Sequence, residues 1–144
     1  MTSRAGTGVT PPPMHKTTSP TSLLLRRTCA TSWRLTSIAS SVEPGLSLVE
    51  HGVEYAITGG RIDLLAKGKD GKFVVIELKL SRGRNKTLGQ ILHYMGWVDK
   101  ELGNAPCRGY IIANSIPDDL RLAVSRVPGV KLAEYKLSFS IKPA

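Results

Sequence analysis

Two acidic residues and a lysine, Asp63, Glu77 and Lys79, stand inside otherwise apolar stretches of the chain. An unpaired charge in an apolar strand is costly, so each of these side chains needs a partner or a function. Successive side chains of a strand alternate between its faces, so Glu77 and Lys79 point the same way, and Asp63 can face them from the neighbouring strand of a hairpin. The spacing therefore predicts two carboxylates and an ammonium group that converge at one end of a hairpin.

Carboxylates placed in this way suit a hard divalent cation. Mg²⁺ keeps several waters and is commonly held by one or two carboxylates together with phosphate oxygens of a substrate. Asp63 and Glu77 are the candidate ligands, with the backbone carbonyl of Leu78 as a third. A bound ion polarises a phosphate and lowers the pKa of a water, and Lys79 can orient that water or stabilise the developing charge. The chemistry predicted is phosphodiester hydrolysis, and the alternative is a plain salt pair of Glu77 with Lys79 beside a solvated Asp63.

The hairpin that would position these residues is predicted from two apolar runs, 61–66 and 73–80, on either side of Asp70-Gly71. Asp-Gly between two such runs is a strong hairpin signal. The run 73–80 is nearly continuous in apolar residues, as expected of a central strand buried on both faces. Upstream, the apolar alternation from Leu46 to Ile57 around His51-Gly52 predicts a second hairpin, with a strand on each side of that turn.

Residues 87–102 have a helical period with two distinct stripes. Downstream, strands are predicted at 110–113 and 130–141, with a short helix at 117–127 between them. The expected core stripe of the long helix consists of Leu88, Ile91, Leu92, Met95, Val98 and Leu102, and the second stripe of Gln90, Tyr94 and Trp97.

The first 42 residues differ in composition from the rest of the 144-residue chain. They are rich in Ser and Thr and contain five basic residues and no acidic one, whereas the remainder has 15 Lys and Arg against 11 Asp and Glu. We expect residues 1–42 to be a disordered or non-native leader, resembling a transit peptide or a displaced start, and residues 43–144 to form the domain. The alternative is that residues 23–38 form a helix that covers the sheet.

The chain contains no apolar run long enough for a membrane span or a secretory signal. Its two cysteines, Cys29 and Cys107, lack the spacing of a disulfide scaffold or a zinc ribbon. These features predict a cytoplasmic protein with no membrane partner. The net charge of +9 permits a polyanionic partner without requiring one.

Three segments in order resemble a known family: Gly60-Arg61-Ile62-Asp63-Leu64-Leu65, Val74-Val75-Ile76-Glu77-Leu78-Lys79, and Gly89-Gln90-Ile91-Leu92-His93-Tyr94-Met95-Gly96-Trp97. They are similar to the PD-(D/E)xK nuclease superfamily, and more closely to the nuclease domain of NucS/EndoMS-type endonucleases. The resemblance extends over about residues 43–142, including Glu43-Pro44-Gly45-Leu46.

The resemblance implies an α/β fold with a restriction-endonuclease-like core, a mixed β-sheet flanked by helices. It also implies a catalytic set of Asp63, Glu77 and Lys79, with Gln90 and Tyr94 lining the site, and Mg²⁺ or Mn²⁺ as the cofactor. The expected function is that of a DNA endonuclease of DNA repair, acting on branched, single-stranded or mismatched DNA. Whether the protein forms a homodimer is left open. The family places an acidic residue in a preceding helix, but residues 20–42 supply no carboxylate.

A basic loop follows the proposed site directly. Arg82, Arg84 and Lys86 could hold a nucleic-acid backbone without reading its sequence, although such a run can equally be a solvated turn. Two other functions remain open: a catalytically impaired nucleic-acid-binding module of the same fold, and a protein-interaction domain.

Overall fold

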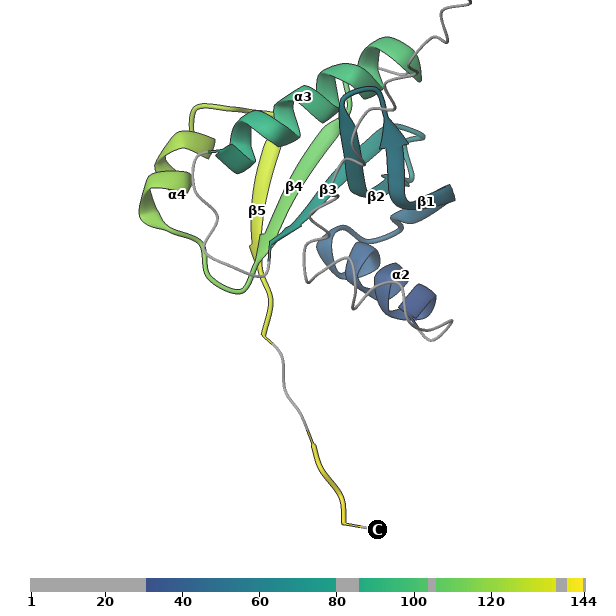
Figure 1. The fold of residues 1–144 in the computed structure, drawn as a ribbon, viewed down its shortest axis with the longest axis vertical. Coiled ribbons are helices and arrows are strands. Elements are labelled where there is room, and N and C mark those ends of the chain that lie inside the picture. Colours follow the sequence, from purple (N-terminus) through teal and green to yellow (C-terminus); the bar gives the residue numbers. More distant parts are fainter. Residues whose placement is uncertain (1–30, 80–85, 104–105, 137–139, 144) are drawn as a thin grey trace, which may run out of the picture.

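The computed structural model describes residues 31–79, 86–103, 106–136 and 140–143. Within them a mixed five-stranded sheet has the spatial order β1-β2-β3-β4-β5 (Figure 1). The pairs β1–β2 and β2–β3 are antiparallel, whereas β3–β4 and β4–β5 are parallel. The predicted mixed sheet with flanking helices is confirmed. The elements are α2 (Thr31–Val42), β1 (Ser47–Ile57), β2 (Gly60–Lys67), β3 (Phe73–Lys79), α3 (Lys86–Glu101), β4 (Arg108–Ala113), α4 (Asp118–Val124) and β5 (Val130–Glu134).

The helices cover both faces of the sheet (Figure 1). On one face, α3 and α4 pack on a core that includes Leu65, Val75 and Ile111. On the other face, α2 packs on Leu64 and Ile76. Both faces of β2 and β3 are therefore covered, which explains the nearly unbroken apolar sequence of β3. No helix among the described residues is long and apolar enough to cross a membrane.

The hairpin predicted around Asp70-Gly71 joins β2 to β3. Gly71 has a φ of +77°, a left-handed conformation that glycine adopts without steric cost. Its N–H donates to the Gly68 carbonyl over 3.0 Å. The resulting register pairs Leu65 with Val75, so their side chains share a face of the sheet.

The second hairpin, predicted around His51-Gly52, is wrong. Ser47–Ile57 is one strand, β1, with an irregular register between Leu48 and Val53. A Cβ at Gly52 would lie 2.4 Å from the carbonyl oxygen of Leu65, so this glycine permits close approach of the backbones rather than a reversal of the chain. The turn that reverses β1 lies between Ile57 and Gly60 instead.

Helix α2 differs from the expectation of disorder for the last twelve residues of the leader. Its Leu35 and Ala39 are 2% and 0% exposed, which makes them part of the core. A helix that covers the sheet, which was the alternative to disorder, is therefore present at residues 31–42. Residues 1–30 lie outside the described part. The apolar residues of this Ser-rich segment are isolated and show no clear helical period. Their packing on the sheet stabilises the helix.

Two predicted stripes of α3 are only partly correct. Ile91, Met95 and Val98 are buried as expected, but Leu92 is 39% exposed. Tyr94, assigned to the second stripe, belongs to the core and is 6% exposed. A tyrosine has an apolar ring and a polar tip, so the ring of Tyr94 can be buried while its hydroxyl reaches a polar group.

The last strand and the last helix are shorter than predicted. β5 ends at Glu134 rather than Ile141, and the described residues beyond it, 135–136 and 140–143, contain no strand; residues 137–139 lie outside the described part. α4 covers Asp118–Val124 rather than 117–127, with Pro117 at its N-cap. The differences fall at element ends, where sequence patterns define boundaries least well.

A cluster of polar side chains ties together three segments at the far end of the hairpin. The guanidinium of Arg108 on β4 donates to both carboxylate oxygens of Glu43, over 3.1 and 2.5 Å, and to Asp70 over 2.7 Å. The Tyr110 hydroxyl donates to Glu43 over 3.0 Å. The α2–β1 connection, the β2–β3 turn and β4 are thereby joined through one arginine.

We expect Leu35→Ala to lower the free energy of unfolding by about 2–5 kcal/mol, since it removes buried methyl groups and leaves a cavity between α2 and the sheet. Chemical denaturation measures this change. Leu122→Ala is the matched control, because Leu122 is 73% exposed on α4 and its truncation should change stability by less than about 0.5 kcal/mol. Equal effects of the two substitutions would contradict the packing of α2.

We expect the Arg108 cluster to make the fold sensitive to acid. Hydrogen bonds from Arg108 hold the pKa values of Glu43 and Asp70 below their ordinary ranges. A lowered pKa stabilises the folded state above the pKa of the unfolded chain, and this contribution disappears as the pH falls through the folded pKa. The free energy of unfolding, measured from about pH 5 down to pH 2, should therefore decrease less steeply for Arg108→Met than for the wild type. Lys100→Met, which removes a more exposed ion pair with Glu101, should leave the wild-type slope.

Candidate active site

Asp63 interrupts the hydrogen bonding between β2 and β3. The last paired residues of this ladder are Leu64 and Ile76, and the next residues toward the site, Asp63 and Glu77, are not a ladder pair. Here Oδ2 of Asp63 accepts a hydrogen bond from the backbone N–H of Leu78 over 2.8 Å. A carboxylate thus replaces a backbone acceptor at the point where the hairpin ladder ends.

Glu77 is a buried acidic residue, 1% exposed, near the end of β3. Its Oε1 lies 2.6 Å from Nζ of Lys79, the last residue of the strand. Its Oε2 is buried and, among the described residues, has no hydrogen-bond partner. A buried carboxylate oxygen without a partner carries a large desolvation cost, which a proton or a cation would remove.

The two carboxylates also affect each other. Burial raises the pKa of Glu77, and the negative charge of Asp63 raises it further. Burial likewise raises the pKa of Asp63, against the lowering effects of the Leu78 N–H and of Lys79. Both groups are therefore harder to ionise than a solvated carboxylate, and one Lys79 ammonium compensates only part of their charge.

Lys79 is linked to helix α3 through a short hydrogen-bonded chain. Its ammonium donates to Oε1 of Gln90 over 3.4 Å, and Nε2 of Gln90 donates to the Tyr94 hydroxyl over 2.9 Å. Gln90 and Tyr94 are four residues apart on one side of the helix, so they can bond directly. The five residues predicted for the site, Asp63, Glu77, Lys79, Gln90 and Tyr94, are thus brought together by the described contacts.

The turn between β1 and β2 also reaches this group, which the sequence did not indicate. A Cβ at Gly60 would lie 2.8 Å from the Tyr94 hydroxyl and 2.9 Å from a carbon of its ring. Gly60 therefore leaves the space in which the Tyr94 side chain lies. A glycine beside a turn is usually explained by the backbone conformation of the turn. The sequence therefore did not show that Gly60 leaves room for the side chain of Tyr94.

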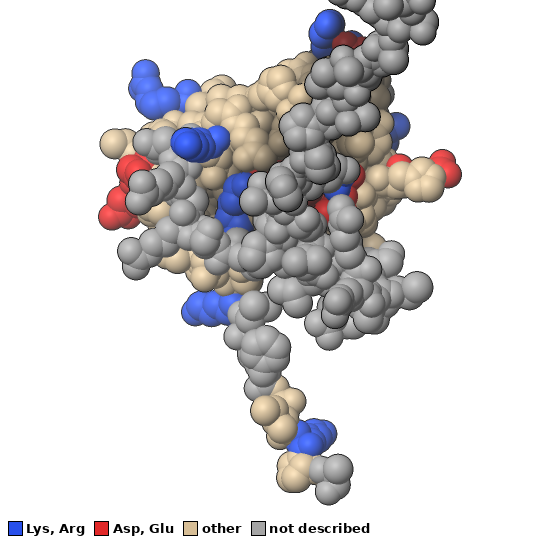
Figure 2. All heavy atoms as spheres, viewed as in Figure 1, with Lys and Arg blue, Asp and Glu red and all other residues tan. Residues whose placement is uncertain are grey.

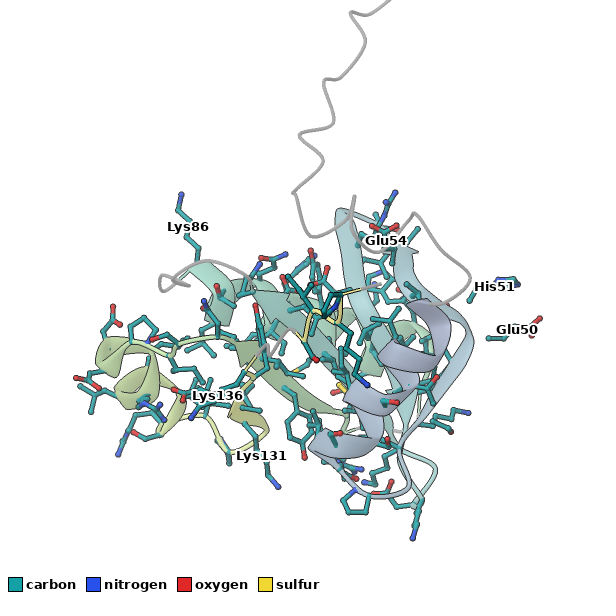
Figure 3. All side chains as sticks on the ribbon, turned by 90° about the horizontal axis from the view of Figure 1, so that it is seen from below. Glu50, His51, Glu54, Lys86, Lys131 and Lys136 are labelled. Carbon is teal, nitrogen blue, oxygen red and sulfur yellow. The ribbon has the colours of Figure 1, made fainter. Side chains whose placement is uncertain are left out.

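The predicted nucleic-acid contacts are only partly described. Arg82 and Arg84 lie outside the described residues, and Lys86 is exposed at the start of α3, where its side chain points away from the protein (Figure 3). On the face drawn in Figure 2, the described Lys and Arg side chains are spread over several positions rather than gathered in one patch. A role of the basic loop stays a prediction.

The donor set fits one hydrated divalent ion rather than a site made by protein ligands alone. Asp63 and Glu77 offer carboxylate oxygens, one of which is buried without a partner among the described residues. Within the described part of the chain, no group of three or more His, Cys, Asp or Glu residues could hold an ion by itself. Mg²⁺ is typically held by one or two carboxylates, with waters and substrate oxygens completing its shell.

The sequence matches a protein-family model. The profile described as the endonuclease NucS C-terminal domain matches residues 35–132. Endonuclease NucS of Frankia alni is 30% identical over 106 residues, which are 72% of this chain and 47% of that protein. Endonuclease NucS of Methanocaldococcus jannaschii is 31% identical over 74 residues, 48% of this chain and 28% of that protein.

Solved structures show the same fold. An EndoMS complex with double-stranded DNA superposes with a TM-score of 0.63 at 23% identity, covering 76% of this chain and 44% of that one. A repair endonuclease from Pyrococcus abyssi gives a TM-score of 0.59 at 24% identity, covering 76% and 46%. The chain spans less than half the length of each of these relatives.

We expect Gly60→Ala to displace the Tyr94 side chain and to lower the free energy of unfolding by about 1–3 kcal/mol, since it overpacks the contact between the turn and α3. Thermal or chemical unfolding measures the loss. In Gly60→Ala/Tyr94→Phe, which lacks the hydroxyl but keeps the ring carbon at 2.9 Å, the combined loss should be smaller than the sum of the two single losses. Additive losses at positions 60 and 94 would contradict the contact.

Gly89→Ala on α3 is the control for this substitution. Apart from the backbone of α3 itself, no described atom lies within 4 Å of the position that the new methyl group would occupy. Because alanine also favours a helix more than glycine does, Gly89→Ala should leave the stability unchanged or raise it.

Proposed function

Since the chain belongs to the endonuclease NucS C-terminal domain family, we propose that it is a DNA endonuclease that hydrolyses phosphodiester bonds with Mg²⁺ or Mn²⁺. We further propose that it is a PD-(D/E)xK nuclease that acts in DNA repair. The single observation that carries the proposal is the buried Glu77 carboxylate, whose Oε2 has no partner among the described residues and whose neighbours are Asp63 and Lys79.

The carboxylates of Asp63 and Glu77 would hold the ion, and the backbone carbonyl of Leu78 would be a third ligand. The N–H and C=O of one residue in an extended strand point to the same side. Because the Leu78 N–H points toward Asp63, its carbonyl is directed to the same edge of β3. Three oxygens on one edge would leave the remaining positions to waters and phosphate oxygens.

When bound, the divalent ion polarises the scissile phosphate and lowers the pKa of a coordinated water. Lys79 contributes an ammonium group beside Glu77, where it can orient the attacking water or stabilise negative charge on the phosphate. Gln90 accepts from Lys79 and donates to Tyr94, so this pair holds the lysine against rotation of its flexible side chain. The ammonium would thereby be placed before the substrate binds.

The proposed substrate is branched, single-stranded or mismatched DNA, held through its phosphates by the basic residues after β3. Arg82, Arg84 and Lys86 follow the site directly in sequence, and their charges would bind the backbone without selecting bases. The structures similar to this chain include one named as a complex of EndoMS with double-stranded DNA, which supports DNA as the partner.

We expect Asp63→Asn, Glu77→Gln and Lys79→Ala each to reduce metal-dependent cleavage by about 100-fold or more, because each removes a charge that acts on the phosphate or its ion. Binding of DNA should be largely retained. The measurement is cleavage of labelled duplex, flap and mismatch DNAs by the purified protein, with and without Mn²⁺. Lys131→Ala is the control, because Lys131 is exposed on β5, two strands away from β3.

Neutralising Arg82, Arg84 and Lys86 together should instead weaken DNA binding for all sequences and reduce its salt dependence. If the wild-type protein cleaves none of these DNAs but binds them with this salt response, the nuclease proposal fails. A nucleic-acid-binding module of the same fold would then be the better description, consistent with the lack of any carboxylate in α2.

A further inference from the structure

Helix α3 has an outer face that takes no part in the site or in the core. The inner side of the helix packs on the sheet through Ile91 and Val98, and no described element covers its outer side in Figure 1. A helix repeats about every 3.6 residues, so residues seven apart lie almost on one line. The exposed residues along the middle of this outer face are Lys86, Gly89, His93, Gly96 and Lys100.

Three basic side chains of the outer face form a row. Lys86, His93 and Lys100 follow one another at intervals of seven residues, and Lys86 points away from the protein in Figure 3. With a rise of ~1.5 Å per residue, this basic row is about 21 Å long, which is the length of about six base pairs of a duplex. The basic row is therefore long enough to contact several successive phosphates of one strand.

The two acidic residues at the end of α3 do not cancel the charge of the basic row. Nζ of Lys100 lies 3.3 Å from Oε1 of Glu101, but both side chains are well exposed, so water screens this ion pair. Oδ1 of Asp99 accepts a hydrogen bond from the backbone N–H of Cys107 over 2.8 Å, which directs it toward the chain before β4. The outer face of α3 therefore suits a polyanion, and its lysines would repel the same face of a second copy of the chain.

Two glycines stand between the basic residues, and the packing of the described residues does not require them. Glycine inside a helix costs about 1 kcal/mol relative to alanine. Apart from the backbone of α3 itself, no described atom lies within 4 Å of the position of a Cβ at Gly89 or Gly96. Glycine also allows the backbone of another molecule to approach a helix closely. Each glycine lies between two members of the basic row, so a chain bound by the row would pass over both.

The basic row passes beside the proposed site at its middle residue. The ring centroids of His93 and Tyr94 are 5.9 Å apart. Nε2 of His93 lies 3.6 Å from the position of a Cβ at Gly59, in the same β1–β2 turn whose Gly60 leaves space for Tyr94. A DNA strand with its scissile phosphate at the site would therefore meet His93 where it leaves the site, and could continue along α3.

We propose that the outer face of α3 binds the phosphate backbone of the DNA strand beside the cleavage site, with Lys86, His93 and Lys100 as its contacts. Gly89 and Gly96 let the backbone lie close to the helix, where the charges of the lysines act over a shorter distance. Contacts of this kind hold a strand without reading its bases. The inference rests on the proposed DNA endonuclease and adds a binding surface to its site.

The test measures the affinity of the full chain for a fluorescent DNA duplex by anisotropy, at several salt concentrations and without divalent ions. We expect Lys100→Gln to weaken binding and to reduce the slope of log affinity against log salt by about 1, because one phosphate contact is lost. Lys131→Gln is the matched control, since Lys131 is an exposed lysine on β5. It should bind the duplex as the wild type does.

The variant Gly89→Ala/Gly96→Ala separates a binding role from a structural one. Because alanine favours a helix, this variant should unfold at the same temperature as the wild type or at a higher one. Its two methyl groups should nevertheless hold the DNA away from the helix and weaken binding by about 10-fold, on the order of two weakened phosphate contacts. Ser40→Ala, an exposed change on α2 across the sheet, should leave the affinity unchanged.

The outcomes separate this inference from the proposed function. If the wild type cleaves DNA with Mn²⁺ and the α3 variants bind the duplex as the wild type does, the surface is refuted while the nuclease stands. If the variants lose affinity but the wild type cleaves no DNA, the surface stands and the nuclease is refuted. A wild type that binds no DNA refutes both.

Two further results for Gly89→Ala/Gly96→Ala would overturn the inference. A lower unfolding temperature would show that the glycines serve the fold itself. A change in the sedimentation of the DNA-free protein would show that they serve a contact between two copies of the chain.

Discussion

The position of the Glu77 carboxylate in an apolar interior is the constraint on which the surrounding structure depends. β3 is covered by helices on both faces, and Glu77 is as well buried as the apolar residues before it. An ionised carboxylate in such a place costs several kcal/mol unless other groups compensate it. Lys79 supplies one compensating charge at 2.6 Å, but Asp63 adds a second negative group nearby. A proton or a cation at Glu77 would compensate the negative charge that remains.

The rest of the fold holds this arrangement from two ends. At the site, α3 contributes Gln90 and Tyr94, which fix Lys79, and the β1–β2 turn leaves space for the Tyr94 side chain at Gly60. At the opposite end of the hairpin, Arg108 joins the β2–β3 turn to β4 and to the segment after α2. The site lies at the carboxyl end of β3, beside the parallel strand β4, which is where α/β sheets commonly bind ligands.

The sequence predicted the centre of the site better than its surroundings. The alternation of side-chain directions along 73–80 and the Asp70-Gly71 turn were sufficient to predict that Asp63, Glu77 and Lys79 converge, because both signals depend on local geometry. The course of β1 was missed, since His51 and Glu54 adopt positive φ values that nothing in their residue types indicates. The burial of Tyr94 was missed, and the packing of α2 was expected only as an alternative to disorder, because both depend on contacts with distant parts of the chain.

The central claim, that Asp63 and Glu77 hold a divalent ion, is tested most directly by crystals grown with Mn²⁺ and measured for anomalous scattering. The account predicts one peak between the two carboxylates, bonded to Oε2 of Glu77 and within reach of the Leu78 carbonyl. It is contradicted if the crystals show no peak there at saturating Mn²⁺ while Glu77 keeps its contact with Lys79. In that case a proton, rather than a cation, would compensate the buried carboxylate.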